Sequence, residues 1–224
     1  MPLILILVDC GLELIPNKIR THPAVKNNIN YKLYSSQLLD NAIHHSAMTN
    51  LKNFQKRGRP DIAHICILSA LGSPLNKSGY LELYIHTANN KIFNIKPEIR
   101  ISRNFNRFKG LIAKLLIDGQ IKLTNNSSII PFNGNLKDLT EKFNDAEIIL
   151  FSRKGKLVKS YHDLFSADIS KNYIVFIGGF QKGIFSNEVL KLSDNIISIS
   201  KNSLDASIVV NRIITFYELV NNIV

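Results

Sequence analysis

YIVFIGGFQKGIFS, residues 173–186, is an apolar run that breaks into two glycines and reaches a third glycine at Gly183. Glycines after a buried strand let the backbone pass very near a ligand or another part of the chain. The stretch lacks the Gly-Lys-Ser/Thr of a P-loop and the Gly-x-Gly-x-x-Gly spacing of a dinucleotide fingerprint. On this local pattern alone, a tight turn and a ligand-binding loop remain equal alternatives.

The same strand-to-loop pattern occurs twice more in the last third of the chain, in AEIILFSRKG (146–155) and NIISISKNSLDASIVVNRII (195–214), where Ser203 is a candidate helix N-cap. Buried apolar runs separated by polar loops and helices predict an α/β domain with a mainly parallel sheet. The strands are expected at 3–8, 62–68, 81–86, 91–95, 147–151, 173–177 and 195–199, and the helices at 36–51, 104–117 and 204–222.

The segment of about 78–126 has a different pattern. LELYIHTANNKIFNI alternates apolar and polar residues around Asn89-Asn90, which predicts a β-hairpin, and a basic helix follows it. We interpret this hairpin and helix as an insertion within one domain that spans residues 1–224. The Asn- and Ser-rich stretch 124–135 is interpreted as a loop.

The charge balance predicts a polyanionic partner. Lys and Arg number 28 against 17 Asp and Glu, which gives a net charge of +11. Such a balance favours RNA or DNA. The chain has only two cysteines, which predicts a cytoplasmic protein. It has no zinc-type Cys/His spacing and no uninterrupted apolar run of ~18 residues, so we expect neither a bound metal nor a membrane span.

Three motifs in the first half of the chain add a family resemblance: KRGRPDIAHICIL (56–68), SPLNKSGYLELYIHT (73–87) and PEIRISRNFNRFKGL (97–111). Together with the C-terminal junctions, they resemble the SPOUT-class ribosome-biogenesis family that methylates N1 of a pseudouridine in small-subunit ribosomal RNA. The likeness runs from about residue 35 to the end. It implies a C-terminal trefoil knot at about 146–214, S-adenosylmethionine bound among the knot loops, small-subunit rRNA as substrate, and a homodimer.

The resemblance also implies the residues that bind the cofactor, largely through backbone groups. They are Gly178, Gly183, Ile196, Ile197, Ser198, Ile199, Ser200, Lys201, Leu204 and Ala206, with Ser152 and Gly155 as weaker candidates in the first knot loop. The sequence departs from the family pattern at two places. Gln181, Lys182 and Ile184 stand where a Pro-His pair is usual, and Asn202-Ser203 stands where Tyr-Pro is expected.

Two features predict RNA contact. Pro60 biases Arg59 towards an extended backbone, and Asp61 can hold the Arg59 guanidinium for a phosphate or base, although an ordinary surface ion pair is the alternative. We place this pair at the mouth of the expected strand 62–68. Given the resemblance, we predict that Arg59 binds RNA, with Asp61 as its anchor or as an acid/base for the N1 proton.

A basic stripe follows on the expected helix 104–117. Arg103, Arg107 and Lys114 share one helix face with Gly110, and Arg100 lies just ahead of the helix. No Asp or Glu interrupts this stripe, so phosphate binding is favoured over a solvated charged face. Two alternative functions stay open, an assembly factor that binds rRNA with little catalysis and a SPOUT methyltransferase that acts on tRNA.

Overall fold

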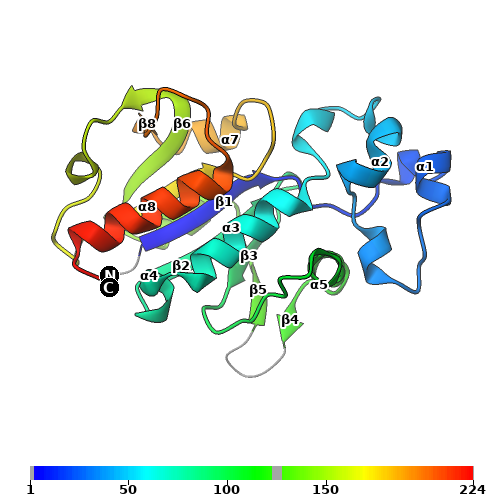
Figure 1. The fold of residues 1–224 in the computed structure, drawn as a ribbon, viewed down its shortest axis with the longest axis horizontal. Helices are drawn as coiled ribbons and strands as arrows, with labels where there is room; N and C mark the ends of the chain where they lie inside the picture. Colours follow the sequence, from blue (N-terminus) through cyan, green and yellow to red (C-terminus); the bar gives the residue numbers. More distant parts are fainter. Residues whose placement is uncertain (1–2, 123–127, 224) are drawn as a thin grey trace.

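The centre of the computed structural model, which describes residues 3–122 and 128–223, is an eight-stranded sheet in the order β4-β5-β3-β2-β1-β7-β6-β8 (Figure 1). Strands β2, β1, β7, β6 and β8 pair in parallel, and β3, β5 and β4 add antiparallel pairs at one side. The mainly parallel sheet is therefore confirmed. The strands are β1 (Leu3–Cys10), β2 (Leu81–Thr87), β3 (Ile92–Ile95), β4 (Ile121–Lys122), β5 (Ser128–Phe132), β6 (Glu147–Leu157), β7 (Tyr173–Gly178) and β8 (Ile196–Ser198).

Helices cover both faces of this sheet. Among the described residues they are α1 (Pro23–Lys26), α2 (Asn41–Met48), α3 (Pro60–Gly72), α4 (Pro74–Lys77), α5 (Phe105–Asp118), α6 (Leu136–Glu141), α7 (Asn187–Leu190) and α8 (Ala206–Val220), with 3-10 turns η1 (Asn17–Ile19), η2 (Tyr34–Gln37), η3 (Phe54–Lys56) and η4 (Tyr161–Asp163). Figure 1 shows α3 and α8 lying across one face of the sheet.

Strand β1 is central because both of its faces are buried. Leu3, Leu5 and Leu7 belong to the main core with α3, α5 and α8, whereas alternate residues such as Ile4 and Ile6 pack against α6 and α7. Burying such a side chain contributes about 1.5–3 kcal/mol to the stability of the folded state. The continuous apolar run LILILV is what this two-sided burial requires.

The expected strand 62–68 is wrong, because these residues lie in helix α3, Pro60–Gly72. Pro60 occupies the first turn, where its missing N–H costs nothing, and the helix is buried against α8, α5 and β1. An apolar run that is covered on several sides looks alike in a strand and a helix. Arg59 and Asp61 therefore stand at a helix N-terminus, and His64 packs between α3 and α5.

Other boundaries also change. Within the stretch 124–135, residues 128–132 form β5 instead of a loop, while 123–127 lie outside the described residues. Pro131 is tolerated there because β5 pairs only with β3 at that point. The expected helix 36–51 is divided into η2 and α2. Asp205, not Ser203, is the N-cap of α8. The hairpin between β2 and β3 is confirmed, with Asn90 in the left-handed region.

Residues 11–59 form a small excursion between β1 and α3, seen at the right of Figure 1. Its own apolar core contains Ile15, Ile19, Val25, Leu39 and Met48. The excursion contacts the rest of the molecule chiefly where η2 packs against α5. This arrangement places the N-terminus of α3 and helix α5 on one continuous side of the molecule.

Candidate functional site

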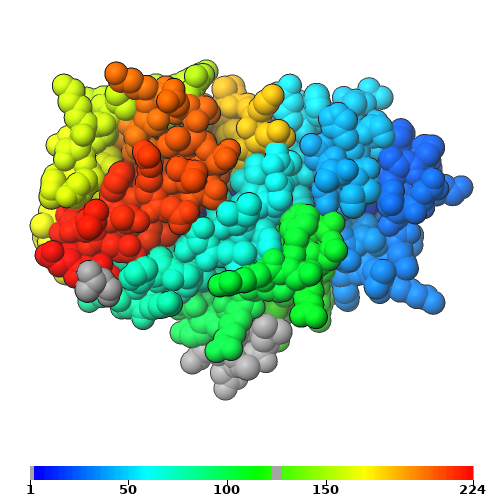
Figure 2. All heavy atoms as spheres, viewed as in Figure 1, coloured from blue at the N-terminus to red at the C-terminus, as the bar shows by residue number. Residues whose placement is uncertain are grey.

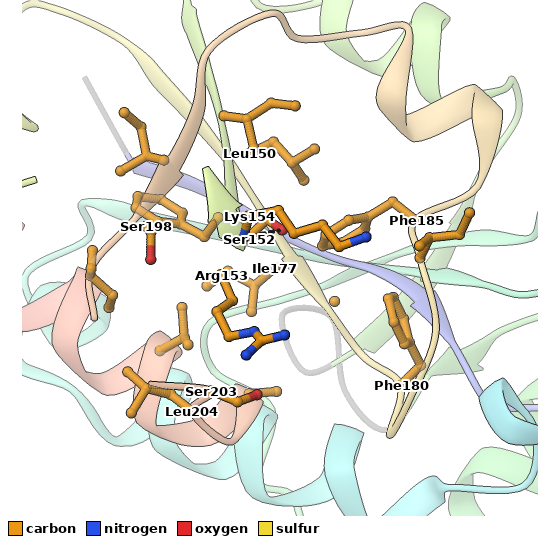
Figure 3. A pocket seen from close by; sticks show the side chains of 18 of the residues that line it. Leu150, Ser152, Arg153, Lys154, Ile177, Phe180, Phe185, Ser198, Ser203 and Leu204 are labelled. Atoms are coloured by element: carbon orange, nitrogen blue, oxygen red, sulfur yellow. Dashed lines mark hydrogen bonds between the residues drawn. The ribbon is translucent and has the colours of Figure 1, made fainter. Parts of the chain in front are cut away.

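The middle of β6 and the loops that follow β7 and β8 line a cavity of about 690 Å³ (Figure 3). The loop expected after residue 151 is wrong, because residues 152–155 form an irregularity within β6, where its pairing with β8 shifts register. The cavity lies at the carboxyl ends of parallel strands, where α/β proteins usually bind ligands. The start of α8 closes another side through Leu204, Ala206 and Val209. A cavity of this size fits a small organic ligand, for which about 300–1,000 Å³ is usual.

The cavity brings together nine of the ten residues that the sequence proposed for the cofactor. They are Gly178, Gly183, Ile196, Ile197, Ser198, Ile199, Ser200, Leu204 and Ala206. Lys201 is exposed and does not line the cavity. The family departures Gln181, Lys182, Ile184, Asn202 and Ser203 all line it, so the unusual residues of this chain face the same space.

Of the two weaker candidates, Ser152 lines the cavity, whereas Gly155 does not line it and lies against β8. Strand β8 pairs with β6 on both sides of residues 152–155, at Phe151 and again at Lys156. Gly155 lies so close to β8 that an added Cβ would stand 2.5 Å from the carbonyl oxygen of Ile196. Only glycine allows this contact, which holds the irregular part of β6 against β8.

Sequence reasoning missed the charged side chains of this cavity. Arg153 and Lys154 follow the buried part of β6 and extend into the cavity in Figure 3, and Lys182 adds a third cation. Among the described residues that line the cavity there is no Asp or Glu. The cavity therefore suits a ligand with an anionic group as well as an apolar ring. In the sequence, the adjacent basic residues Arg153 and Lys154, close after the apolar run EIILF, were the signal that could have predicted this positive charge.

A buried ion pair ties the β7 loop to the end of β1. The Lys56 ammonium lies 3.0 Å from a carboxylate oxygen of Asp9, and the same oxygen accepts a 2.7 Å hydrogen bond from the Ser186 backbone N–H. Lys56 also lies 4.5 Å from the centre of the Phe180 ring. Gly183 has φ of +131°, and an added Cβ there would stand 3.0 Å from Lys56 Cε. The loop after β7, which lines the cavity, therefore packs against Lys56.

His86 completes this cluster as a neutral side chain. The Asp9 backbone N–H donates to His86 Nδ1 over 3.2 Å, so Nε2 carries the proton towards Asn90 Oδ1. Burial lowers the pKa of His86 despite the nearby Asp9 carboxylate. The residue next to Lys56, Arg57, makes a two-pronged ion pair with Glu13, with one N–O distance of 2.7 Å. Both cations are therefore paired with buried carboxylates of the protein, whereas the partner of Arg59 is the more exposed Asp61.

Asp9→Asn is expected to lower the free energy of unfolding by about 2–3 kcal/mol. The change leaves the Lys56 ammonium without its charged partner in a site where that side chain is only 16% exposed. Urea denaturation measures the difference. The matched control is Glu147→Gln, which breaks the exposed ion pair with Lys171 and should cost less than about 1 kcal/mol. An Asp9→Asn protein as stable as the control would contradict the proposed importance of this link.

Arg59 and Asp61 form a planar two-pronged pair at the start of α3. Arg59 Nε and Nη2 lie 2.8 and 2.6 Å from the two carboxylate oxygens of Asp61. The hydrogen bonds that Arg59 donates to Asp61 raise the pKa of Arg59, and the charges of Asp61, Asp40 and Asp205 add to this effect. Burial opposes ionisation of Asp61, but the hydrogen bonds and charge of Arg59 keep its pKa below the usual value. Asp61 is therefore an ionised anchor in the free protein.

Asp205 connects this pair with the cavity. It stands between Leu204 and Ala206, which both line the cavity, and its charge acts on Arg59. The backbone of Arg59 is held by a 3.1 Å hydrogen bond to the carbonyl of Gly11, one residue beyond β1. Helix α3, which starts directly after Arg59, packs against α8, whose first residues line the cavity.

The remaining predicted RNA-binding arginines lie at and before the start of α5. Arg107 is exposed in its first turn, and Arg100 and Arg103 are exposed in the segment that precedes the helix. The stripe is interrupted at Gly110, where Ser35 of η2 packs at 3.9 Å from the position of a Cβ. Lys109 is withdrawn from the surface into a 2.8 Å ion pair with Asp40.

The two aromatic side chains near this face are less open than the arginines. Phe105 is only half-buried, but the Lys109 ammonium lies 5.0 Å from its centre. His64 is buried, stacks on Phe108 at 4.2 Å and bonds the Ser102 carbonyl over 2.7 Å. His64 is thus a satisfied core histidine.

Within 3–122 and 128–223, no three His, Cys, Asp or Glu side chains gather as metal ligands would. In the same ranges, no helix has the length and apolar character needed to cross a membrane.

Comparisons with known proteins agree with each other. The family model described as EMG1/NEP1 methyltransferase matches residues 5–218. The ribosomal RNA small subunit methyltransferase Nep1 of Staphylothermus marinus is 40% identical over 226 residues, which cover 100% of this chain and 98% of that protein. Nep1 of Thermococcus kodakarensis is 35% identical, with 96% of both chains covered. The crystal structure of Archaeoglobus fulgidus Nep1 bound to S-adenosylhomocysteine superposes with a TM-score of 0.85 at 33% identity, covering 99% of this chain and 100% of that one.

Proposed function

The chain belongs to the EMG1/NEP1 methyltransferase family, and from this we propose that it transfers a methyl group from S-adenosylmethionine to N1 of a pseudouridine in small-subunit ribosomal RNA. The observation that carries the proposal is the cavity of about 690 Å³ with the Arg59–Asp61 pair beside it. One site holds a small ligand with apolar and anionic parts, and the adjacent site presents a fixed guanidinium. A methyl donor and an RNA substrate need these two sites next to each other.

The residues of the cavity fit S-adenosylmethionine. Ile197, Ile199 and Leu204 supply apolar walls for an adenine ring, and Gly178 gives the ligand access to the backbone. Arg153, Lys154 and Lys182 are the candidates to pair with the carboxylate of the methionine part. Ser152, Gly155 and the remaining predicted residues complete the proposed binding loops.

When bound, S-adenosylmethionine supplies a methyl group that its positive sulfur already activates. The protein then has to hold the target base in line with that methyl group, outside the RNA helix. Arg59 is proposed to hold the RNA near the cavity, with Asp61 fixing the guanidinium. Both Asp61 oxygens bond Arg59, and no carboxylate among the described residues lines the cavity, so we assign Asp61 the anchoring role and leave the N1 proton to solvent.

The choice of pseudouridine follows from chemistry. The N1 atom of uridine carries the glycosidic bond, whereas N1 of pseudouridine is free and bears a proton. Only pseudouridine can therefore accept a methyl group at N1, whatever the affinity for either nucleotide. Exposed Arg100, Arg103 and Arg107 are proposed to hold the neighbouring phosphates.

A homodimer and a cytoplasmic location are part of the proposal. Ile208 and Leu219 of α8 are 43% and 54% exposed, which leaves apolar surface for a second copy to cover. Cys10 and Cys66 are both buried as free thiols, as expected in a reducing compartment. The knot at about 146–214 and the insertion at about 78–126 likewise remain proposals.

The test uses labelled S-adenosylmethionine and two versions of a small-subunit rRNA hairpin, with pseudouridine or uridine at the target position. We expect label only in the pseudouridine RNA. Label in both RNAs would refute N1 specificity. Label in neither hairpin, together with tight RNA binding, would indicate an assembly factor. Label in neither hairpin but in a tRNA tested alongside them would show that tRNA is the substrate.

A further inference from the structure

The loop of residues 30–37, here called the tyrosine loop, exposes three large apolar side chains within four residues. Tyr31 is 63% exposed, Leu33 56% and Tyr34 41%. Exposed apolar groups are common singly, but a cluster on a short loop points to a binding role. The mechanism described above uses none of these residues.

Hydrogen bonds hold the tyrosine loop in one shape. Ser36 Oγ donates to the Asn30 carbonyl over 2.7 Å and accepts from the Asn30 N–H over 2.8 Å. The Leu33 N–H donates to the same carbonyl over 2.8 Å, and the Asn30 side chain accepts from Lys32 N over 3.0 Å. The loop backbone is therefore fixed without using either tyrosine ring. A rigid aromatic loses little freedom when a ligand stacks on it.

The tyrosine loop lies against the basic helix. Ser35 packs at Gly110 of α5, between the exposed Arg107 and Lys114 on the same helix face. Figure 2 shows the blue surface of this segment projecting from the molecule on the side of the green surface of α5. An added Cβ at Gly110 would meet Ser35 at an ordinary van der Waals distance of 3.9 Å, so the loop and α5 lie in direct contact at this position.

The positive charge of the segment around the tyrosine loop indicates which class of partner it binds. Residues 14–39 contain the cations Lys18, Arg20, Lys26 and Lys32 and no Asp or Glu. A surface that combines exposed aromatic rings with unbalanced positive charge is complementary to single-stranded nucleic acid, whose bases stack on the rings while its phosphates meet the cations.

We propose that the tyrosine loop is a stacking platform for unpaired bases of the RNA whose phosphates α5 holds. The proposal rests on the proposed function, because it extends the same RNA surface away from the methyl-transfer cavity. Tyr31 and Tyr34 are the stacking residues, and Lys32 between them contacts phosphate. The platform would hold nucleotides outside the target base and so add affinity for an RNA with a single-stranded loop.

The test compares Tyr31→Ala and Tyr34→Ala with the wild-type protein, using a fluorescent small-subunit rRNA hairpin and a fully paired RNA duplex. Each alanine variant should bind the hairpin about 5- to 100-fold more weakly and the duplex as before. The slope of log affinity against log salt should not change. Arg107→Gln is the matched control, which should reduce that slope by about one on both RNAs. Phenylalanine at either tyrosine should restore hairpin binding.

Two outcomes would overturn the platform. Alanine variants that bind the hairpin as tightly as wild type exclude stacking, and equal losses on hairpin and duplex indicate a general effect on the fold or charge. A methyl-transfer assay distinguishes failure of the platform from failure of the proposed function. If the platform is correct, the alanine variants raise KM for the hairpin and keep kcat. Absence of methyl transfer in the wild-type protein would refute the proposed function while leaving the binding comparison readable.

Discussion

Gly155→Ala is expected to abolish binding of S-adenosylhomocysteine and to destabilise the protein by more than about 3 kcal/mol. The added Cβ would lie 2.5 Å from the Ile196 oxygen and 2.6 Å from the carbonyl carbons of Ile196 and Ile197. These are backbone atoms of β8, so no rotamer change can relieve the overlap. Either β8 or residues 152–155 of β6 have to move, and β8 and residues 152–154 line the cavity.

The measurements are calorimetric titration with S-adenosylhomocysteine and thermal unfolding. Gly72→Ala is the matched control, because nothing lies within 4 Å of its added Cβ at the exposed end of α3. That variant should change stability by less than about 1 kcal/mol and leave affinity unchanged. A Gly155→Ala protein that binds S-adenosylhomocysteine as the control does would show that the close contact with β8 is not needed for the cavity.

Arg59→Lys should lower kcat/KM for the rRNA hairpin by about 100-fold, because lysine cannot reproduce a planar two-pronged contact and small displacements of a substrate are costly. Asp61→Asn should weaken hairpin binding by about tenfold or more, since it removes the charge that holds the guanidinium. Both changes act on a pair with N–O distances of 2.8 and 2.6 Å.

The pH profile separates the two roles of Asp61. Its pKa lies below the usual value, so the carboxylate stays ionised through the whole neutral range. As an anchor, Asp61→Asn should leave the shape of the profile from pH 6 to 9 unchanged and alter only its height. A general base would instead be revealed if the variant changed that shape. Glu141→Gln, which removes the 3.5 Å exposed pair with Lys137, should change neither binding nor rate.

Much of the architecture could be predicted from the sequence. Continuous apolar runs such as YIVFI and LILILV predicted buried parallel strands, and the C-terminal strand-to-loop junctions predicted where the cavity would lie. The structural comparison with Archaeoglobus fulgidus Nep1 supports the α/β SPOUT resemblance. The roles of individual cofactor and RNA residues remain predictions.

The errors have a physical cause. Helix α3 was interpreted as a strand because tertiary contacts bury most of it, which removes the polar face that reveals a helix. The Lys56–Asp9 pair was missed because its residues lie 47 positions apart, and no local pattern reports such a contact. Pro60, at the first turn of a helix, was the available signal for α3.

The position of β1 in the sheet sets the order of events during synthesis. Leu3 of β1 pairs with Leu81 of β2 on one side and with Tyr173 of β7 on the other. At ordinary elongation rates of about 5–20 residues per second, the second edge of β1 waits roughly 10–30 s for its partner strand. During that time a fully apolar strand has an open edge, which invites aggregation. Newly made chains are therefore most in need of chaperone protection before β7 is translated.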